Sequence, residues 1–320
     1  MPTLKPLNLY PVREYLIIYL KGIAMGAADV VPGVSGGTIA FISGIYERLL
    51  TSIRHVDGHA VKLLFGLKFK ELGEYVNGSF MLALLSGIAT SILALSRLIL
   101  YLLNNHPEMV WSFFFGLVVA SALVMSRKIH HWTVPAIISG LLGTGIAYWI
   151  TVAVPVETPT DLWFIFLSGS IAICAMILPG ISGSFILLLM GKYEYIFKAL
   201  IALDVKIILT FILGCLTGIL SFSHVLNLLL KRYHDVAVAL LMGFMVGSLN
   251  KVWPWKQVLQ TYTDRHGEVK PLLEGNVLPT HYLELAGKEP YLLYCTLLCI
   301  FGFGLVYGLE KLSDRSSGAI

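Results

Sequence analysis

An apolar segment interrupted at Pro-Gly-x-Ser-Gly occurs twice in this chain and constrains its fold more than any other feature. The first copy is Pro-Gly-Val-Ser-Gly-Gly at 32–37, followed by an apolar run and Gly-Ile-Tyr-Glu at 44–47. The second is Pro-Gly-Ile-Ser-Gly-Ser at 179–184, followed by an apolar run of the same length and Gly-Lys-Tyr-Glu at 191–194. All matches hold at one constant offset without a gap. The pattern predicts an internal duplication.

Composition indicates that the duplicated chain lies in a bilayer. Of its 320 residues, 57% are hydrophobic and only 13% are charged, whereas a soluble domain carries roughly 25% charged residues. The net charge of +4 is not gathered into a basic stripe, so we expect no nucleic-acid partner. The four cysteines lie in apolar stretches without a disulfide or zinc pattern, and His130-His131 alone is weak evidence for a metal. We therefore expect no metal and no other cofactor.

Each half is predicted to contain a broken hairpin followed by three full spans. The first repeat is 1–154 with its hairpin at 12–50, and the second is 155–320 with its hairpin at 161–200. Every span is close to the ~20 apolar residues that a helix needs to cross the hydrocarbon core. The fold class is therefore an all-α polytopic membrane protein. The six spans are expected at 79–103, 109–126, 134–154, 205–230, 235–251 and 290–310.

Three crossings between the two motifs would invert the second repeat relative to the first. The charges of the short loops agree, because Arg and Lys occur at 127–128 and 231–232 but not at 104–108 or 155–161. The positive-inside rule then predicts that both termini are cytoplasmic. The long loop at 253–289 would be extracytoplasmic.

The broken segments have the chemistry of an anion site. Proline and glycine end a helix, and the freed backbone groups cannot face lipid. We therefore expect a re-entrant helix–break–helix at each motif; two ordinary kinked spans are the alternative. A helix that begins at the break directs N–H groups and its positive dipole end into it. The glycines could instead serve only close helix packing. The candidate phosphate-binding residues in the two motifs are Ser35, Gly36, Gly37, Thr38, Ser182, Gly183 and Ser184.

Charged residues in apolar segments extend this interpretation, because they usually face a cavity or a partner. Arg97 is the candidate countercharge for phosphate, although it could snorkel to the headgroups. Its equivalent in the second repeat is His224, for which a packing role is equally open. Asp29 would pair with Arg97 or carry a proton. Glu47 and Glu194 are candidates for coupling, or for ordinary capping at the surface.

Catalytic motifs are missing from the chain. There is no His-Glu-x-x-His, no Gly-x-Ser-x-Gly and no Gly-x-x-x-x-Gly-Lys-Ser/Thr. We therefore expect a transporter and not an enzyme. An intramembrane enzyme acting on a lipid phosphate, with Ser35 or His224 as a reactive group, remains a rival. The others are a secondary transporter of a small soluble anion and a structural or assembly protein.

The paired motifs at 29–47 and 178–194 resemble a bacterial membrane family long catalogued as domain of unknown function 368. The resemblance covers nearly the whole chain. It implies a multi-pass protein of the bacterial cytoplasmic membrane that returns undecaprenyl phosphate, the lipid carrier of cell-wall synthesis, from the outer to the inner leaflet. The second motif departs from the first in having Ser184 where the first has Gly37. The glycine-rich spans permit a homodimer without requiring one.

Overall fold

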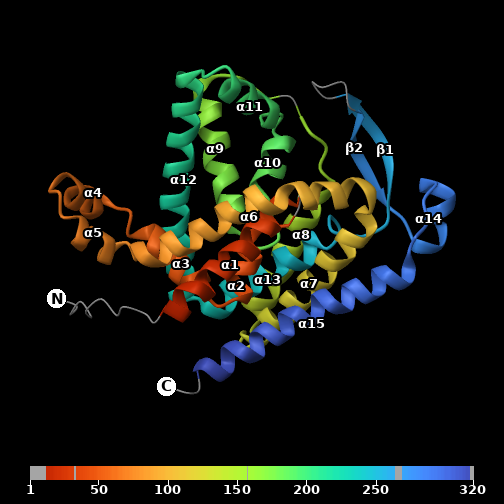
Figure 1. The fold of residues 1–320 in the computed structure, drawn as a ribbon, viewed down its shortest axis with the longest axis horizontal. Coiled ribbons are helices and arrows are strands. Elements are labelled where there is room, and N and C mark those ends of the chain that lie inside the picture. Colours follow the sequence, from red (N-terminus) through yellow and green to blue (C-terminus); the bar gives the residue numbers. More distant parts are fainter. Residues whose placement is uncertain (1–11, 32–33, 157, 264–268, 318–320) are drawn as a thin grey trace.

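The computed structural model describes residues 12–31, 34–156, 158–263 and 269–317, and these residues are mostly helical (Figure 1). Short helices follow each break, and long helices form the body. The first half comprises α1 (Val12–Val30), α2 (Gly36–Ile42), α3 (Tyr46–Arg54), α4 (Gly58–Phe65), α5 (Phe69–Tyr75), α6 (Gly78–Asn105), α7 (Pro107–Arg127) and α8 (Val134–Val152). The second comprises α9 (Leu162–Ile177), α10 (Gly183–Leu189), α11 (Tyr193–Ile201), α12 (Val205–Arg232), α13 (His234–Ser248), β1 (Lys256–Thr263), β2 (Val269–Asn276), α14 (Pro279–Ala286) and α15 (Leu292–Ser317).

The expected interruptions occur at both motifs. Helix α1 ends at Val30 and α2 begins at Gly36, while α9 ends at Ile177 and α10 begins at Gly183. A second interruption follows in each copy, where Gly44 has φ 72° and Gly191 has φ 63°. Such left-handed backbone is readily adopted by glycine, which lacks a Cβ. Both motifs therefore produce a long helix, a break, a short helix, a turn and another short helix.

Apolar helices dominate the rest of the fold. Within the described residues, α6, α7, α8 and α12 are long and apolar enough to cross a membrane. Helices α9 and α13 and the Leu292–Gly308 part of α15 are shorter and also apolar. Large apolar side chains such as Leu93 and Trp149 are exposed on α6 and α8, as is natural for surfaces that face lipid. The helical membrane fold is confirmed.

Close parallel helix pairs begin each half, and they meet at equivalent residues. A Cβ on Gly87 of α6 would clash with the carbonyl oxygen of Tyr19 in α1. At the corresponding positions of the second copy, a Cβ on Gly214 of α12 would clash with the carbonyl oxygen of Phe166 in α9. Only glycine permits backbones to approach this closely. The same interface therefore occurs in both halves.

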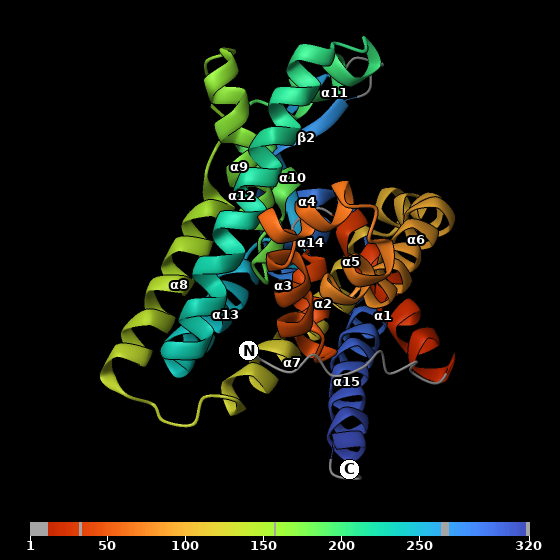
Figure 2. The same ribbon diagram turned by 90° about the vertical axis from the view of Figure 1, so that its left-hand side faces the viewer.

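The remaining long helices pair across the halves. A Cβ on Gly116 of α7 would clash with the carbonyl oxygen of Cys299 in α15, and one on Gly243 of α13 would clash with that of Gly140 in α8. These contacts also occupy equivalent positions in the two copies. The last helix of each half therefore packs against the other half, as Figure 2 shows for α8 beside α13. Among the described residues, one large buried core runs through both halves, and a second, smaller cluster contains Trp255 and Tyr282.

Two segments differ from the expectation of spans and loops. Residues 58–75 form α4 and α5, which project from one side of the body (Figure 1). The loop at 253–289 contains the antiparallel strands β1 and β2 and the helix α14, so the fold includes a small sheet. Lys256 on β1 lies 4.1 Å from the centroid of the Trp111 ring on α7. Burial lowers the pKa of Lys256 to about 8, although the carboxylate of Glu274 acts in the opposite direction.

Candidate functional site

The two Pro-Gly-x-Ser-Gly motifs lie against each other in the interior. The Ser35 hydroxyl lies 3.2 Å from the carbonyl oxygens of both Met176 and Leu178. In the opposite direction, the backbone N–H of Gly180 donates to the Thr38 hydroxyl oxygen at 3.0 Å. Ser35 and Thr38 are both almost completely buried. Polar groups of the first motif thus satisfy backbone groups that the second break releases.

Two further contacts hold the motifs together. The Tyr46 hydroxyl, which belongs to the Gly-x-Tyr-Glu part of the first copy, donates to the carbonyl oxygen of Ile177 at 3.2 Å. A Cβ on Gly37 would lie 2.6 Å from the same oxygen. The first break therefore needs both a tyrosine that reaches across and a glycine that permits the approach. Tyr193, the equivalent tyrosine in the second copy, is exposed.

The first break already holds an anion of its own. The Asp29 carboxylate accepts a hydrogen bond from the Gly36 N–H at 2.7 Å, at the beginning of α2. The Ser35 hydroxyl oxygen accepts from the Gly37 N–H at 3.1 Å as the N-cap of this helix. Two of the N–H groups expected to be free for phosphate are thus bonded within the motif. Asp29 occupies the position where an external anion would bind.

The second break has the same backbone but different side chains. Met176 stands at the position equivalent to Asp29, and Ser182 makes no side-chain cap to α10. The Ser182 and Ser184 hydroxyls lie 2.9 Å apart, and Ser184 is exposed. Among the residues that the structure describes, the N–H groups of Gly183 and Ser184 find no acceptor. The second break is therefore the more open of the two anion sites.

The structure does not bring the predicted countercharge and its partner together. Asp29 bonds to Gly36, whereas Arg97 on α6 is exposed and has no ion pair within the described part of the chain. The Asp29–Arg97 pair that the sequence suggested is therefore not formed. His224 is also exposed, and its Nδ1 lies 2.9 Å from the carbonyl oxygen of Leu220 in the same helix. This local contact suits the packing role.

The two glutamates lie away from the breaks. Glu47 is exposed at the beginning of α3. The Glu194 carboxylate lies 3.5 Å from the Lys198 ammonium one helical turn away, with both side chains substantially exposed. An exposed pair of this type contributes little to stability. Both positions fit surface capping better than coupling.

Two lysines near the motifs were missed by the sequence analysis. The Lys21 ammonium donates to the carbonyl oxygen of Ser43, the C-cap of α2, at 2.6 Å. The Lys192 ammonium is buried, donates to the carbonyl oxygen of Thr158 at 2.7 Å, and lies 5.4 Å from the centroid of the Phe164 ring. A lysine inside an apolar segment is itself the signal that should have identified them. Each copy thus has a lysine near the end of its first short helix.

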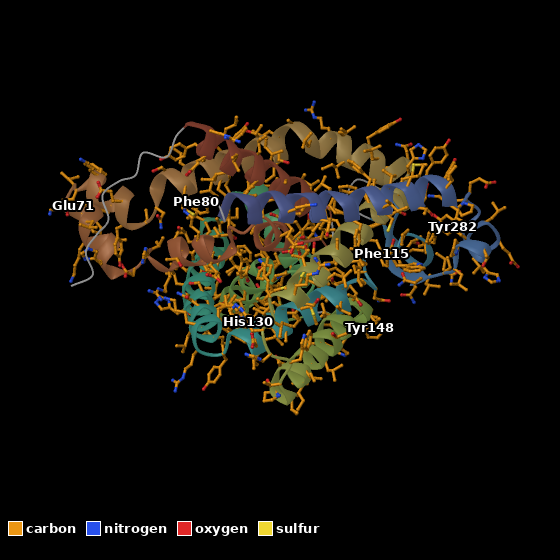
Figure 3. All side chains as sticks on the ribbon, turned by 90° about the horizontal axis from the view of Figure 1, so that it is seen from below. Glu71, Phe80, Phe115, His130, Tyr148 and Tyr282 are labelled. Carbon is orange, nitrogen blue, oxygen red and sulfur yellow. The ribbon has the colours of Figure 1, made fainter. Side chains whose placement is uncertain are left out.

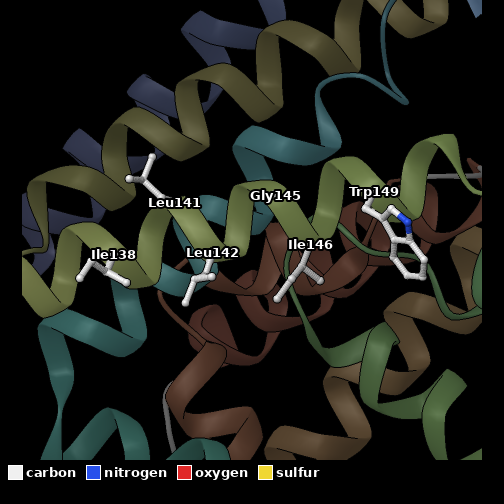
Figure 4. A pocket seen from close by; sticks show the side chains of 6 residues that line it. All are labelled: Ile138, Leu141, Leu142, Gly145, Ile146 and Trp149. Atoms are coloured by element: carbon white, nitrogen blue, oxygen red, sulfur yellow. The ribbon is translucent and has the colours of Figure 1, made fainter.

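An apolar hollow lies on the outer face of α8 (Figure 4). It has a volume of about 440 Å³ and no charged residue in its lining. Such a surface cannot neutralise a phosphate but suits a hydrocarbon chain. The residues that line it are Ile138, Leu141, Leu142, Gly145, Ile146 and Trp149.

The fold and the paired breaks define a helical membrane protein with a polar junction of broken helices in its interior. Residues 25–270 match the model of the undecaprenyl phosphate translocase-like family, and the chain belongs to this family. It is 46% identical over 302 residues to a polyprenyl-phosphate transporter of Vibrio cholerae, covering 94% of this chain and 98% of the relative. It is 32% identical over 254 residues to a polyprenyl-phosphate transporter of Staphylococcus aureus, covering 73% and 85%. No solved structure matches the chain. The resemblance drawn from the motifs is confirmed.

Proposed function

We propose that this protein moves undecaprenyl phosphate from the outer to the inner leaflet of the bacterial cytoplasmic membrane. The observation that carries the proposal is the junction of two broken helices in a chain whose relatives are named polyprenyl-phosphate transporters. Broken helices that meet inside a bundle are the usual site for an anionic substrate in secondary transporters. A phosphate on a lipid is an anion of this class.

The initial binding site for the phosphate is the break between α9 and α10. There the N–H groups of Gly183 and Ser184 lack acceptors among the described residues, and the hydroxyls of Ser182 and Ser184 stand beside them. Phosphate oxygens accept from such groups at the beginning of a helix. Arg97 supplies the countercharge. Since α6 runs parallel to α1, with Ser91 beside Gly26, continuing this register would bring Arg97 to the level of the junction.

Asp29 regulates the first break. Its carboxylate competes with phosphate for the Gly36 N–H, because both are anions that accept from the same donor. Protonation of Asp29 would weaken this internal bond and make the N–H available. Proton coupling therefore acts at Asp29 and not at Glu47, Glu194 or His224.

Alternating access follows from inverted repeats in this proposal. The N–H of His130, directly after α7, donates to the Asp235 carboxylate at the beginning of α13 at 3.0 Å. Helices α7 and α13 occupy equivalent places in the two copies and pack against each other. The C-terminal end of α7 lies beside the N-terminal end of α13, which supports opposite orientations of the two copies in the membrane. Each hairpin would then open toward a different leaflet. With both termini cytoplasmic, the loop of β1, β2 and α14 is extracytoplasmic.

The lipid tail stays in the bilayer during transfer. The hollow on α8 and the exposed apolar faces of the long helices contact hydrocarbon, so only the charged headgroup needs protein shelter. This division explains how a chain of 320 residues could move a lipid with a long polyprenyl tail.

The direct test reconstitutes the protein in liposomes and follows transfer of undecaprenyl phosphate between leaflets, with and without a proton gradient. Acceleration over empty vesicles is expected, and none under any gradient would reject the proposal. An excess of inorganic phosphate should compete weakly; full inhibition together with uptake of labelled phosphate would instead identify a soluble-anion transporter. Arg97→Ala should reduce headgroup binding by about tenfold and Arg97→Lys by much less, since a lysine retains the charge.

A further inference from the structure

Three side chains with metal-ligand chemistry cluster where the two halves of the chain meet. His130 lies in the loop after α7, while His234 and Asp235 begin α13. Their ligand atoms all lie within 4.8 Å of one another. The Nδ1 atoms of both histidines are 3.2 Å from the same Asp235 oxygen. Two segments about a hundred residues apart in sequence thus converge on one carboxylate, and they come from different copies of the repeat.

The carboxylate is held in place by backbone groups. The His130 N–H donates to Oδ1 of Asp235, and the His131 N–H donates to Oδ2, both at 3.0 Å. Hydrogen bonds of this kind orient a metal-binding carboxylate, and each carboxylate oxygen has a second lone pair for an ion. The imidazole rings of His130 and His234 both approach Oδ1, and their centroids are 5.2 Å apart. The ligands are therefore arranged before any ion arrives.

The cluster is accessible from water. A polar hollow of about 540 Å³ adjoins it, and Arg232 and Tyr233 also line this hollow. The His130 side chain, labelled in Figure 3, is 71% exposed. An ion from solution could reach the site and keep a water molecule or a solvent anion as its remaining ligand.

The separations suit a small tetrahedral cation. Zinc binds histidine nitrogen and carboxylate oxygen at about 2.0–2.2 Å, which puts neighbouring ligand atoms slightly more than 3 Å apart. The two nitrogen-to-oxygen distances already have this value. Two imidazoles and one carboxylate favour Zn²⁺ over Mg²⁺ or Ca²⁺, which prefer oxygen ligands. In the alternative without metal, one carboxylate oxygen accepts from two imidazoles and an amide.

We propose that His130, His234 and Asp235 form a Zn²⁺ site with an open fourth position, contrary to the expectation of no metal. The ion would join the end of α7 in the first copy to the beginning of α13 in the second. Zinc would therefore stabilise the contact between the copies and slow any motion that separates these two helix ends. The site does not depend on the nature of the transported substrate.

Isothermal titration of the full chain with ZnCl₂ tests the site. The protein is purified through a tag without histidine and treated with EDTA. We expect one zinc ion per chain with micromolar or tighter affinity, and a loss of about tenfold or more in His130→Asn and in His234→Asn. His131→Asn is the matched control, because only its backbone bonds Asp235 and its ring lies outside the ligand group.

Cobalt substitution and thermal unfolding provide readouts that do not depend on transport. Bound Co²⁺ should give the absorption of a tetrahedral site in the wild type and in His131→Asn, and lose it in His130→Asn. Zinc should raise the melting temperature of the same two proteins only, because an ion that binds the folded state stabilises it. No saturable binding at micromolar zinc, or equal affinity in His130→Asn and His131→Asn, would overturn the proposal.

Discussion

The two broken helices share a backbone but not a chemistry. The short helices after each break, α2 and α10, have the same length, and the turns after them use glycine at equivalent positions. At the break itself, Asp29 bonds the N–H of the first short helix, whereas Met176 stands at the equivalent place in the second. The two motifs thus share a scaffold, and only the first contains an internal anion at this position.

This difference suggests that the two breaks bind different anions. A helix beginning stabilises one negative charge near its N–H groups. In the first break that charge belongs to the protein, and in the second the groups remain open among the described residues. Under our proposed function, an external phosphate binds where the protein has not supplied its own carboxylate.

The largest effect is expected when the second break receives a carboxylate equivalent to Asp29 of the first. Met176→Asp would introduce a carboxylate next to Gly183, where a phosphate is proposed to bind. Like charges about 4 Å apart repel by roughly 1–4 kcal/mol, so lipid binding should fall by about fivefold to nearly a thousandfold, and transport in liposomes should stop. Met176→Asn, which has the same shape as the aspartate variant without the charge, should retain most activity. Equal activity of the two variants would contradict a phosphate at the second break.

Exchanging the residues at Gly37 and Ser184 tests how tightly each break is packed. Gly37→Ser introduces a Cβ only 2.6 Å from the carbonyl oxygen of Ile177, and such overpacking costs roughly 1–3 kcal/mol. Ser184→Gly, at the exposed equivalent position, should change stability much less. Thermal unfolding in detergent measures both. A melting temperature of Gly37→Ser at or above that of the wild type would show that the junction is looser than the structure indicates.

Removing the charge of Asp29 should have the smallest effect on folding but a distinct effect on pH dependence. The Asp29→Asn variant keeps a side-chain oxygen near the Gly36 N–H, but this oxygen accepts more weakly because it carries no charge. If protonation of Asp29 frees the first break, wild-type transport rises as the pH falls, and the variant is fast and insensitive to pH. Transport rates measured in liposomes from acidic to alkaline pH provide the check. A variant with the wild-type pH profile would remove Asp29 from the coupling mechanism.

Local patterns predicted the elements but not their partners. The six apolar helices and both breaks were readable, because apolar runs, proline and glycine act on the chain within a few residues; the turns at Gly44 and Gly191 were not predicted. The hydrogen bond between Asp29 and the Gly36 N–H was not predicted. The sequence suggested Arg97 as the partner of Asp29 instead. The choice depends on which face of α1 turns toward α2, and that is set by the packing of Gly22 and Gly26 against α6. The strands β1 and β2 were also missed, since their polar and apolar residues do not alternate clearly.

The sequence by itself determined that this protein is a helical membrane protein with two glycine-rich breaks, and it predicted the duplication, because composition and repeated local motifs carry that information directly. Only the tertiary structure decided that the breaks touch, that the last helix of each half packs on the other half, and that His130 meets His234 and Asp235. These are contacts between residues distant in sequence. They depend on which surfaces the close-packed glycines allow to approach, and no single stretch of the chain encodes that choice.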